Sequence, residues 1–412
     1  MKKTLAFVFA AGCVVGSYAT DARVDVMGKH DAFFRDEISV FRNPADMSLY
    51  PNMLYGSYGW VDKHHPTNTA LEASAFIRSN VSLSDPFFGA MLSHKISEAE
   101  NAPMYSFGAF VNRRDKMLDY LIEASRMDNN GNYNKSFSPR LNEPTGKLDL
   151  MFGYDLGNGI ALGLGLYGAY QKEKLRENTE NQTGVYKVNA GINWNLDQGL
   201  DFEASINGGS VTGMFAPTPG AQLVNVTDGD YFYRGDVRFF SAVPSINGAF
   251  VPQVGMEIRK FNDEDVLDVD GGIGINMNID RGFFWTGIQG LYTQKNMGPR
   301  DTEESIGGRI GFGIERNIMW DWFLIRVGGQ KEIRHIKTDV NRVKTSQWVE
   351  MNKDYRETNA EDELVALGFG VNIDNRLRID FVSSNDVAYT FTNLVSSPQL
   401  ALFKKISATY RF

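Results

Sequence analysis

From residue 147 to its end, the chain alternates apolar and polar residues in segments of seven to twelve residues that are separated by tight turns. Alternation with period two predicts strands, and the turn residues between them predict antiparallel hairpins. Four hairpins, with turns Gly-Asn-Gly, Asp-Gln-Gly, Asp-Arg-Gly and Asp-Asn-Arg, join 148–156 to 160–171, 185–196 to 200–211, 269–279 to 283–294, and 364–373 to 377–383.

The connections between hairpins are of two lengths. Two medium stretches, 96–103 and 241–248, are predicted to turn on the same side as the tight turns. Short turns on one side and long loops on the other are typical of the β-barrels of bacterial outer membranes. Longer polar stretches, predicted to be loops on the opposite side, occupy residues 172–183, 212–230, 294–304 and 334–363.

Strand length separates such a barrel from a soluble sandwich, whose strands also alternate. Several predicted strands reach ten to twelve residues, whereas soluble strands usually have about 5–6 and a tilted bilayer crossing needs about 9–11. With a first strand near 54–61 and a last strand ending at Phe412, the tally is sixteen. An even number places both termini on one side, and closure removes the unpaired edges. The predicted fold is an all-β transmembrane antiparallel β-barrel, residues 53–412.

The last eight residues alternate to the end of the chain. Ile406, Ala408, Tyr410 and Phe412 would form one face, and Lys405, Ser407, Thr409 and Arg411 the other. This pattern predicts the closing strand, since chain ends otherwise fray.

Residues 1–19 have the features of a signal peptide: Lys2 and Lys3, an apolar run from 5 to 15, and small residues at Ser17 and Ala19. A lipoprotein signal with Cys13 as the modified residue is the alternative. Cys13 is the only cysteine, so the mature chain is predicted to have no disulfide. No later stretch approaches the ~18 consecutive apolar residues of a spanning helix.

Enzyme motifs are missing from the sequence. It has no HExxH, no GxSxG, no phosphate loop and no dinucleotide fingerprint, so we predict no catalytic residues, no metal and no cofactor. The net charge of −8 argues against a nucleic-acid partner. Three alternatives remain: a hydrolase built from scattered residues, a metal at His64 and His65, and divalent ions at an acidic outer loop that contains Asp263, Glu264, Asp265, Asp268 and Asp270.

Four tryptophans lie close to predicted short turns: Trp194, Trp285, Trp320 and Trp322. Because Trp favours the membrane boundary, we expect them to form one aromatic girdle. The alternative is that they are core residues of a soluble sheet.

If the apolar faces point to lipid, the opposite faces line the lumen. On the strand after Gly159, small inward residues at Ala161, Gly163, Gly165 and Ala169 leave room for a plug or a lateral opening. Charges of both signs are also predicted to face inward, and many could pair with one another: Asp149, Lys187, Glu203, Glu257, Arg259, Arg309, Glu315, Arg378 and Asp380.

Residues 20–52 precede the first strand and do not alternate. Within them, VDVMGKHDAFFRDEISVFRNPADMSLYPN resembles the N-terminal region of the FadL and PorV families of outer-membrane barrels, in which a glycine, an acidic short helix and an Asn-Pro-Ala motif lead into the barrel. The resemblance covers about thirty residues, and Asp46 stands where a glycine is common. The matching positions are Gly28, Asp36, Glu37, Asn43, Pro44 and Ala45.

The resemblance implies a barrel of fourteen strands with an N-terminal plug, in which those six residues serve plugging and gating. Two of the sixteen tallied strands would then be loop segments, so the expected number is fourteen to sixteen. The resemblance also implies that Tyr410 and Phe412 form the signal read by the barrel assembly machinery. Because the hairpins lie outside residues 24–50, we expect the barrel to fold without them and to conduct more. The expected function is a plugged channel for small, including hydrophobic, molecules, without enzymatic activity.

Two other functions stay open: a PorV-like accessory that carries secreted cargo proteins, and a structural or adhesive surface barrel. The expected location is the outer membrane of a Gram-negative-type bacterium, in contact with its lipids and with both termini in the periplasm.

Overall fold

The computed structural model describes residues 21–412 except 29, 63–80, 84–85, 100, 126–139, 175–179, 197–198, 217–222, 227–229, 262–263, 298–300, 341–342, 351–364, 375 and 384–402. The predicted signal peptide and Cys13, as well as Lys29, His64, His65 and Asp263, lie outside these described residues.

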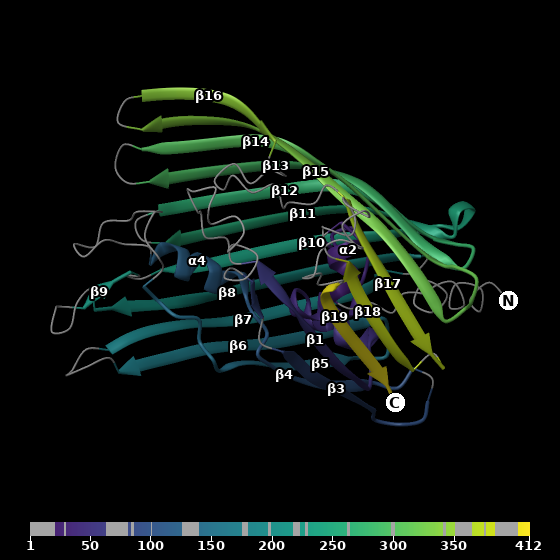
Figure 1. Ribbon diagram of the computed structural model, residues 1–412. Coiled ribbons are helices and arrows are strands. Elements are labelled where there is room, and N and C mark those ends of the chain that lie inside the picture. The colour runs from purple at the N-terminus through teal and green to yellow at the C-terminus, as the bar shows by residue number, and fades with distance from the viewer. Residues whose placement is uncertain are drawn as a thin grey trace, which may run out of the picture.

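Sixteen strands form a closed antiparallel ring in which each pairs with its neighbours along the chain (Figure 1). The ring closes where the last strand pairs with the first, with Met53 opposite Arg411. The sixteen-strand tally is confirmed. The strands are β1 (Met53–Asp62), β3 (Phe87–Lys95), β4 (Met104–Val111), β5 (Lys147–Asp155), β6 (Ile160–Lys174), β7 (Glu180–Leu196), β8 (Leu200–Phe215), β10 (Tyr231–Val243), β11 (Gly248–Phe261), β12 (Glu264–Ile279), β13 (Gly282–Met297), β14 (Thr302–Asn317), β15 (Phe323–Val340), β17 (Val365–Ile373), β18 (Leu377–Ser383) and β19 (Phe403–Arg411).

Shorter elements complete the described fold. Three short strands extend the sheet: β2 (Val81–Leu83), β9 (Val224–Asn225) and β16 (Val343–Glu350). The helical elements are α2 (Asp21–Val26), η1 (Glu37–Phe41), η2 (Pro44–Leu49), α4 (Lys116–Ala124) and η3 (Pro244–Ile246). None of the described helices has the length and apolar character needed to cross a membrane.

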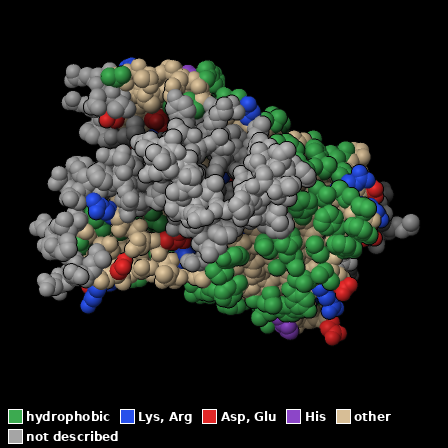
Figure 2. Space-filling view, viewed as in Figure 1, with side chains coloured by type: hydrophobic (Ala, Val, Ile, Leu, Met, Phe, Trp, Pro, Cys, Tyr) green, Lys and Arg blue, Asp and Glu red, His purple; other side chains and the backbone are tan. Residues whose placement is uncertain are grey.

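The outer face of the wall is apolar and the inner face is largely polar, which is the reverse of a soluble protein. On β6, Leu162, Leu164 and Leu166 are 45–48% exposed on the outer face, while Ala161 and Tyr167 are buried on the inner one. Charged side chains such as Asp149 and Glu203 are 2% exposed on the inner face. Hydrophobic side chains cover much of the outer wall near β3 and β17–β19 (Figure 2). Water would disfavour such an outer surface, whereas lipid favours it.

The four predicted hairpins are confirmed by the pairing of their strands, although residues 197–198 and 375 of two turns lie outside the described residues. Backbone conformation explains several of the turn residues that are described. Gly157, Gly159 and Gly199 have positive φ, which glycine adopts without a steric penalty. Arg281 and Asp374 adopt the same region in the Asp-Arg-Gly and Asp-Asn-Arg turns. The medium stretch 96–103 connects β3 to β4, with residue 100 outside the described residues. The predicted turn 241–248 is shorter than expected, since β10 continues to Val243 and β11 begins at Gly248.

Several predicted loops are partly strand. β6 continues to Lys174 and β8 to Phe215, and β15 runs to Val340 before β16 pairs back on it. Alternation of polar with apolar residues is weak in these stretches, so their strand character was missed. Backbone pairing with the neighbouring strand determines the structure there, because each added residue extends an existing ladder. The wall is consequently uneven: β15 has 18 residues and β7 has 17, whereas β18 has 7.

The lipid-facing assignment can be tested on β6. We expect Leu164→Arg to destabilise the barrel by about 2–4 kcal/mol in lipid vesicles, because it places a charge in the apolar band. The free energy of unfolding from denaturant titration measures this. The control is Leu223→Arg, since Leu223 is equally exposed but lies beyond the end of β8. Equal losses in both variants would contradict a bilayer around β6.

Candidate functional site in the barrel interior

Residues 21–50, hereafter the N-terminal segment, end just before the first strand. Two N-terminal caps determine where its 3-10 helices begin. Asp36 accepts a hydrogen bond from the Ile38 amide and, with Ser39, forms a capping box that starts η1. Asn43 accepts from the Ala45 amide, and Pro44 occupies the first position of η2. The sequence therefore specifies two short helical turns with a sharp junction between them at Arg42 and Asn43.

Asn43, Pro44 and Ala45 lie against bare backbone on the inner faces of β6 and β7. A Cβ atom on Gly163 would lie 2.1 Å from the Ala45 nitrogen, and one on Gly191 would lie 1.8 Å from Asn43 Oδ1. Only glycine permits contacts this close. We call Gly163 and Gly191 the glycine notch.

Amide side chains of β7 fasten the same turn. Asn43 Nδ2 donates to Asn193 Oδ1, and Asn193 Nδ2 donates to Asp46 Oδ1 at 2.7 Å. Asn189 Nδ2 donates to the Phe41 and Arg42 carbonyls at 2.9 and 2.8 Å. The Asn-Pro-Ala turn is thus packed closely against the glycine notch and is also fixed by the side-chain hydrogen bonds of β7.

A buried ion network centred on Glu315 joins the start of the segment to β14, β15 and β18. Arg23 donates to both oxygens of Glu315 at 2.9 Å and lies 3.2 Å from Asp36. Arg326 and Arg378 also donate to Glu315, at 2.9 and 3.2 Å. Asp380 pairs with Arg326 at 2.8 Å and with Arg378 at 3.1 Å. Three arginines thus face three carboxyl groups where water is excluded, and every arginine has an acidic partner. Burial raises the pKa of Asp36 to about 8, so Glu315 and Asp380 are the stronger partners.

A second network joins the segment to β8 and β10. Glu203 pairs with Arg35 of the segment and with Arg238 of β10. Arg238 also donates to the carbonyls of Asp31 and Phe34, at 2.7 and 3.0 Å. Arg35 reaches Asp201 at 3.0 Å, and its guanidinium lies 4.3 Å from the centre of the Phe240 ring. The segment is therefore anchored on two separate parts of the ring, β14–β18 and β8–β10.

Trp285 corrects the predicted aromatic girdle. Its side chain is fully buried in the interior, and its Nε1 donates to the Met27 carbonyl at 2.9 Å. Gly28 (φ +90°) lies against its ring, because a Cβ there would be 2.8 Å from Trp285 Cζ2. Closeness to a turn was a poor guide, since strand alternation decides which face a residue takes. Trp194, Trp320 and Trp322 are 44–50% exposed.

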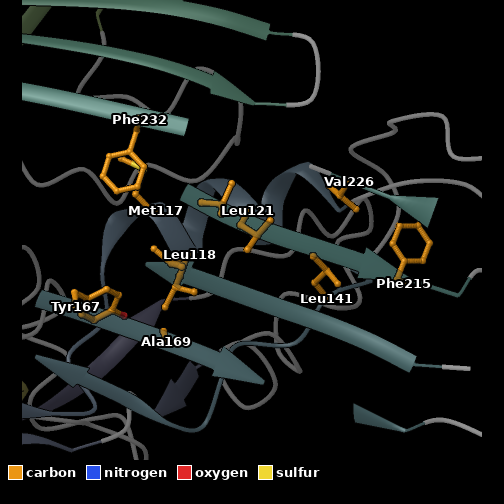
Figure 3. Packing of buried hydrophobic residues seen from close by; sticks show 11 residues of the cluster. Met117, Leu118, Leu121, Leu141, Tyr167, Ala169, Phe215, Val226 and Phe232 are labelled. Atoms are coloured by element: carbon orange, nitrogen blue, oxygen red, sulfur yellow. The ribbon is translucent and has the colours of Figure 1, made fainter. Parts of the chain in front are cut away.

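The barrel interior also contains α4, which comes from the connection between β4 and β5. Its apolar residues pack on inward residues of β6–β8 and β10, including Tyr167, Ala169 and Phe232 (Figure 3). Ion pairs fix the residues that lead into α4 to the wall. Arg113 pairs with Asp149 at 2.7 Å, and Asp115 pairs with Lys187 at 2.7 Å. This helix was not predicted, because the sequence was interpreted only in terms of strands and the turns between them.

The α4 connection also contacts the N-terminal segment. The Arg113 guanidinium lies 4.5 Å from the centre of the Phe41 ring and 4.9 Å from that of Tyr167. Lys116, at the start of α4, pairs with Glu257 of β11. Two layers, the N-terminal segment and the α4 connection, therefore touch inside the barrel.

The remaining predicted lumen residues also lie on the inner face with partners. Arg259 pairs with Glu257 at 2.7 Å and with Asp268 at 2.6 Å, and Arg309 pairs with Glu332 at 2.6 Å. The acidic run is not an outer loop: from Glu264 onward it belongs to β12. Asp270 pairs with Arg234 at 3.1 Å, and Glu264 with Lys295 at 2.7 Å. The cationic partners come from other strands, β10 and β13, and the sequence does not show which strand residues lie next to each other.

Tyr410 and Phe412 occupy the outer face at the closing strand. They are 39% and 56% exposed, and their rings stack with centroids 6.3 Å apart. Sequence reasoning did not list Arg23, Arg238 or Arg326, which are central to the networks. Period-two alternation could have placed Arg238 and Arg326 on the inner face, whereas Arg23 precedes the strands and gave no such signal.

No protein-family model and no curated protein sequence matches this chain. Similar solved structures include a loop L8 deletion mutant of OmpT, an outer membrane protein of Vibrio cholerae, at 7% sequence identity and a TM-score of 0.34, covering 88% of this chain and 97% of that one.

A deltaS2 mutant of the TodX monoaromatic hydrocarbon channel has 9% identity and a TM-score of 0.38, over 96% and 99% of the two chains. BamA from Haemophilus ducreyi lacking POTRA domains 1–3 has 6% identity and a TM-score of 0.37, over 87% and 70%. Identities and TM-scores this low say nothing of what this chain binds.

One titratable group of the segment predicts a pH dependence. Burial lowers the pKa of His30 to about 4, and the positive charge of Arg309 acts in the same direction. The ring packs against Trp285 and Phe33, and its Nε2 is buried without a hydrogen-bond partner among the described residues. The neutral imidazole is thus the form that the folded state favours.

Because this pKa is below its ordinary value, the contribution to stability is present above about pH 6.5 and is lost as the pH falls towards about 4. We expect His30→Phe to remove up to about 3 kcal/mol of acid destabilisation in that window, while preserving the ring packing. Denaturant titrations at pH 7 and pH 4.5 measure it. His94→Phe, at an exposed position of β3, is the control; an equal change there would sink the assignment to His30.

Proposed function

We propose that this protein is an outer-membrane channel for small molecules, hydrophobic ones included, in which the N-terminal segment acts as a plug. In this proposal both termini lie in the periplasm and the protein has no enzymatic activity. The observation that carries it is the fastening of the segment to two separate parts of the inner wall, at Glu315 on β14 and at Glu203 on β8. A segment bound to the inner wall at two separate places would obstruct the route through the ring.

The inner wall offers two kinds of surface for a passing molecule. Paired charges line β10–β15, for example Arg259 with Asp268 and Arg309 with Glu332. Apolar residues of β6–β8 and β10 meet α4 on another part of the wall (Figure 3). Opening then requires displacement of the segment, and the contact between Arg113 and Phe41 would couple it to the α4 connection.

The glycine notch allows a direct test of the plug. A Cβ at Gly163 would overlap backbone atoms of Pro44 and Ala45, whereas one at Gly165 on the same face would meet Asn189 at an ordinary 3.5 Å. Overpacking costs about 1–3 kcal/mol. We therefore expect Gly163→Ala to raise the open fraction in planar bilayers about tenfold, and Gly165→Ala to match the unmodified protein.

Two results would reject the plugged channel. One is an unmodified protein that already conducts like an open pore. The other is a Gly163→Ala variant whose conductance equals that of the unmodified protein although both proteins are folded. Purification from native membranes separates the accessory alternative, since a carrier of secreted cargo should be recovered together with secreted proteins.

A further inference from the structure

The N-terminal segment binds the inner face of the last strand from Lys405 to Arg411. Lys405 Nζ lies 2.6 Å from Asp25 Oδ2, and Ser407 Oγ accepts a hydrogen bond of 3.3 Å from the Ala22 amide. Thr409 donates to Glu37 Oε2 at 2.8 Å, and Arg411 donates to Glu37 Oε1 at 2.9 Å. The polar half of the alternating C-terminal sequence therefore has one common partner.

The first strand is held by the same segment on the other side of the seam. Met53 and Tyr55, inward residues of β1, are 1% and 4% exposed and pack in one cluster with Val40, Met47 and Tyr50. The Arg411 guanidinium also lies 5.9 Å from the centre of the Tyr50 ring. Tyr50 thus contacts the residues of both strands at the point where the ring closes.

The wall at this seam has few backbone pairs of its own. β1 pairs with β19 over 7 described residues and with β3 over 5, whereas β12 and β13 pair over 16. β18 and β19 also change register between Val382 and Ser383. A short ladder with a register shift specifies its alignment weakly, so additional contacts across the seam have a large effect there.

Glu37 is the centre of these contacts. It is 1% exposed, its two oxygens accept from two different residues of β19, and Arg411 is 374 positions away in the chain. Burial raises the pKa of Glu37, while Arg411 and Thr409 oppose that shift. A carboxylate this buried needs its partners, and those partners are present only once β19 has joined β1.

We propose that the N-terminal segment has a second function as an internal clasp that joins the last strand to the first and sets their register. The segment follows directly into β1, so it is in place beside the first strand before β19 is added. Glu37 and Asp25 then select Arg411, Thr409 and Lys405 in a single alignment. A slip by one residue would turn these three side chains towards lipid, and a slip by two would separate them from Glu37.

The clasp is tested by refolding the chain from residue 20 onward out of urea into lipid vesicles. Closure is followed as the band whose gel mobility changes on heating. We expect Glu37→Gln and Arg411→Met each to slow its appearance about tenfold and to lower the temperature at which it is lost, because the closing contacts form during the rate-limiting step. Glu98→Gln, exposed in the turn 96–103, should leave both quantities unchanged.

Charge reversal distinguishes a specific Glu37–Arg411 pairing from a general loss of barrel stability. Glu37→Arg and Arg411→Glu should each impair closure, and the double variant should recover most of the lost rate. A double variant no better than either single one overturns the clasp. So does a chain lacking residues 21–50 that closes at the unmodified rate.

The result is separable from the channel proposal. Gly163→Ala disturbs the glycine notch on β6, away from β19, and should alter conductance without slowing closure. Glu37→Gln should slow closure and says nothing of conductance in the barrels that do form. If Gly163→Ala slows closure as much as Glu37→Gln, the effect belongs to the whole segment, and the specific clasp at β19 is wrong.

Discussion

A charge inside this barrel is stable only where an opposite charge reaches it, and that requirement organises the interior. Glu315, Glu203 and Glu37 are each almost fully buried, and each accepts from an arginine. In every case the pair joins the N-terminal segment to the wall, on β14, β8 and β19 in turn. Losing one member would leave a buried charge without its partner, which costs far more than a surface pair contributes. The segment and the ring are therefore energetically one unit.

The same requirement explains where small residues are needed. Polar side chains can pair across the interior only if the backbone of the segment comes close to the strands, and Gly163 and Gly191 allow that approach. Elsewhere large residues fill the space, as Trp285 does beside Met27 and Gly28. Outside, the strands present leucine, isoleucine and aromatic side chains, because lipid offers no partner for a charge. The same alternation therefore places apolar side chains towards lipid and polar side chains towards the barrel interior.

Both proposals, the plug and the clasp, concern the N-terminal segment. The contacts that would make it a plug, at Glu203 and the glycine notch, lie on β6–β8 and β10. The contacts that would make it a clasp lie on β1 and β19. The residues that make the two sets of contacts alternate along the segment, since Arg35 lies two positions from Glu37. The plug and the clasp therefore differ in the wall strands they use and not in the part of the segment. The α4 connection adds a second layer on the side of β6–β8, where Arg113 touches Phe41. From the sequence the segment resembled a removable insert, because its role at the seam involves partners some 370 residues away.

The sequence by itself determined what depends on near neighbours. Period-two alternation and turn residues such as Gly157 and Gly159 specify strands, hairpins and which residues share a face, and these predictions gave the sixteen-strand ring. The caps at Asp36 and Asn43 are equally local. Only the tertiary structure decided the partners: that Arg23 reaches Glu315, that Trp285 is buried, and that the acidic run belongs to β12. These outcomes depend on how strands stagger when the ring closes, and no short stretch of sequence records that stagger.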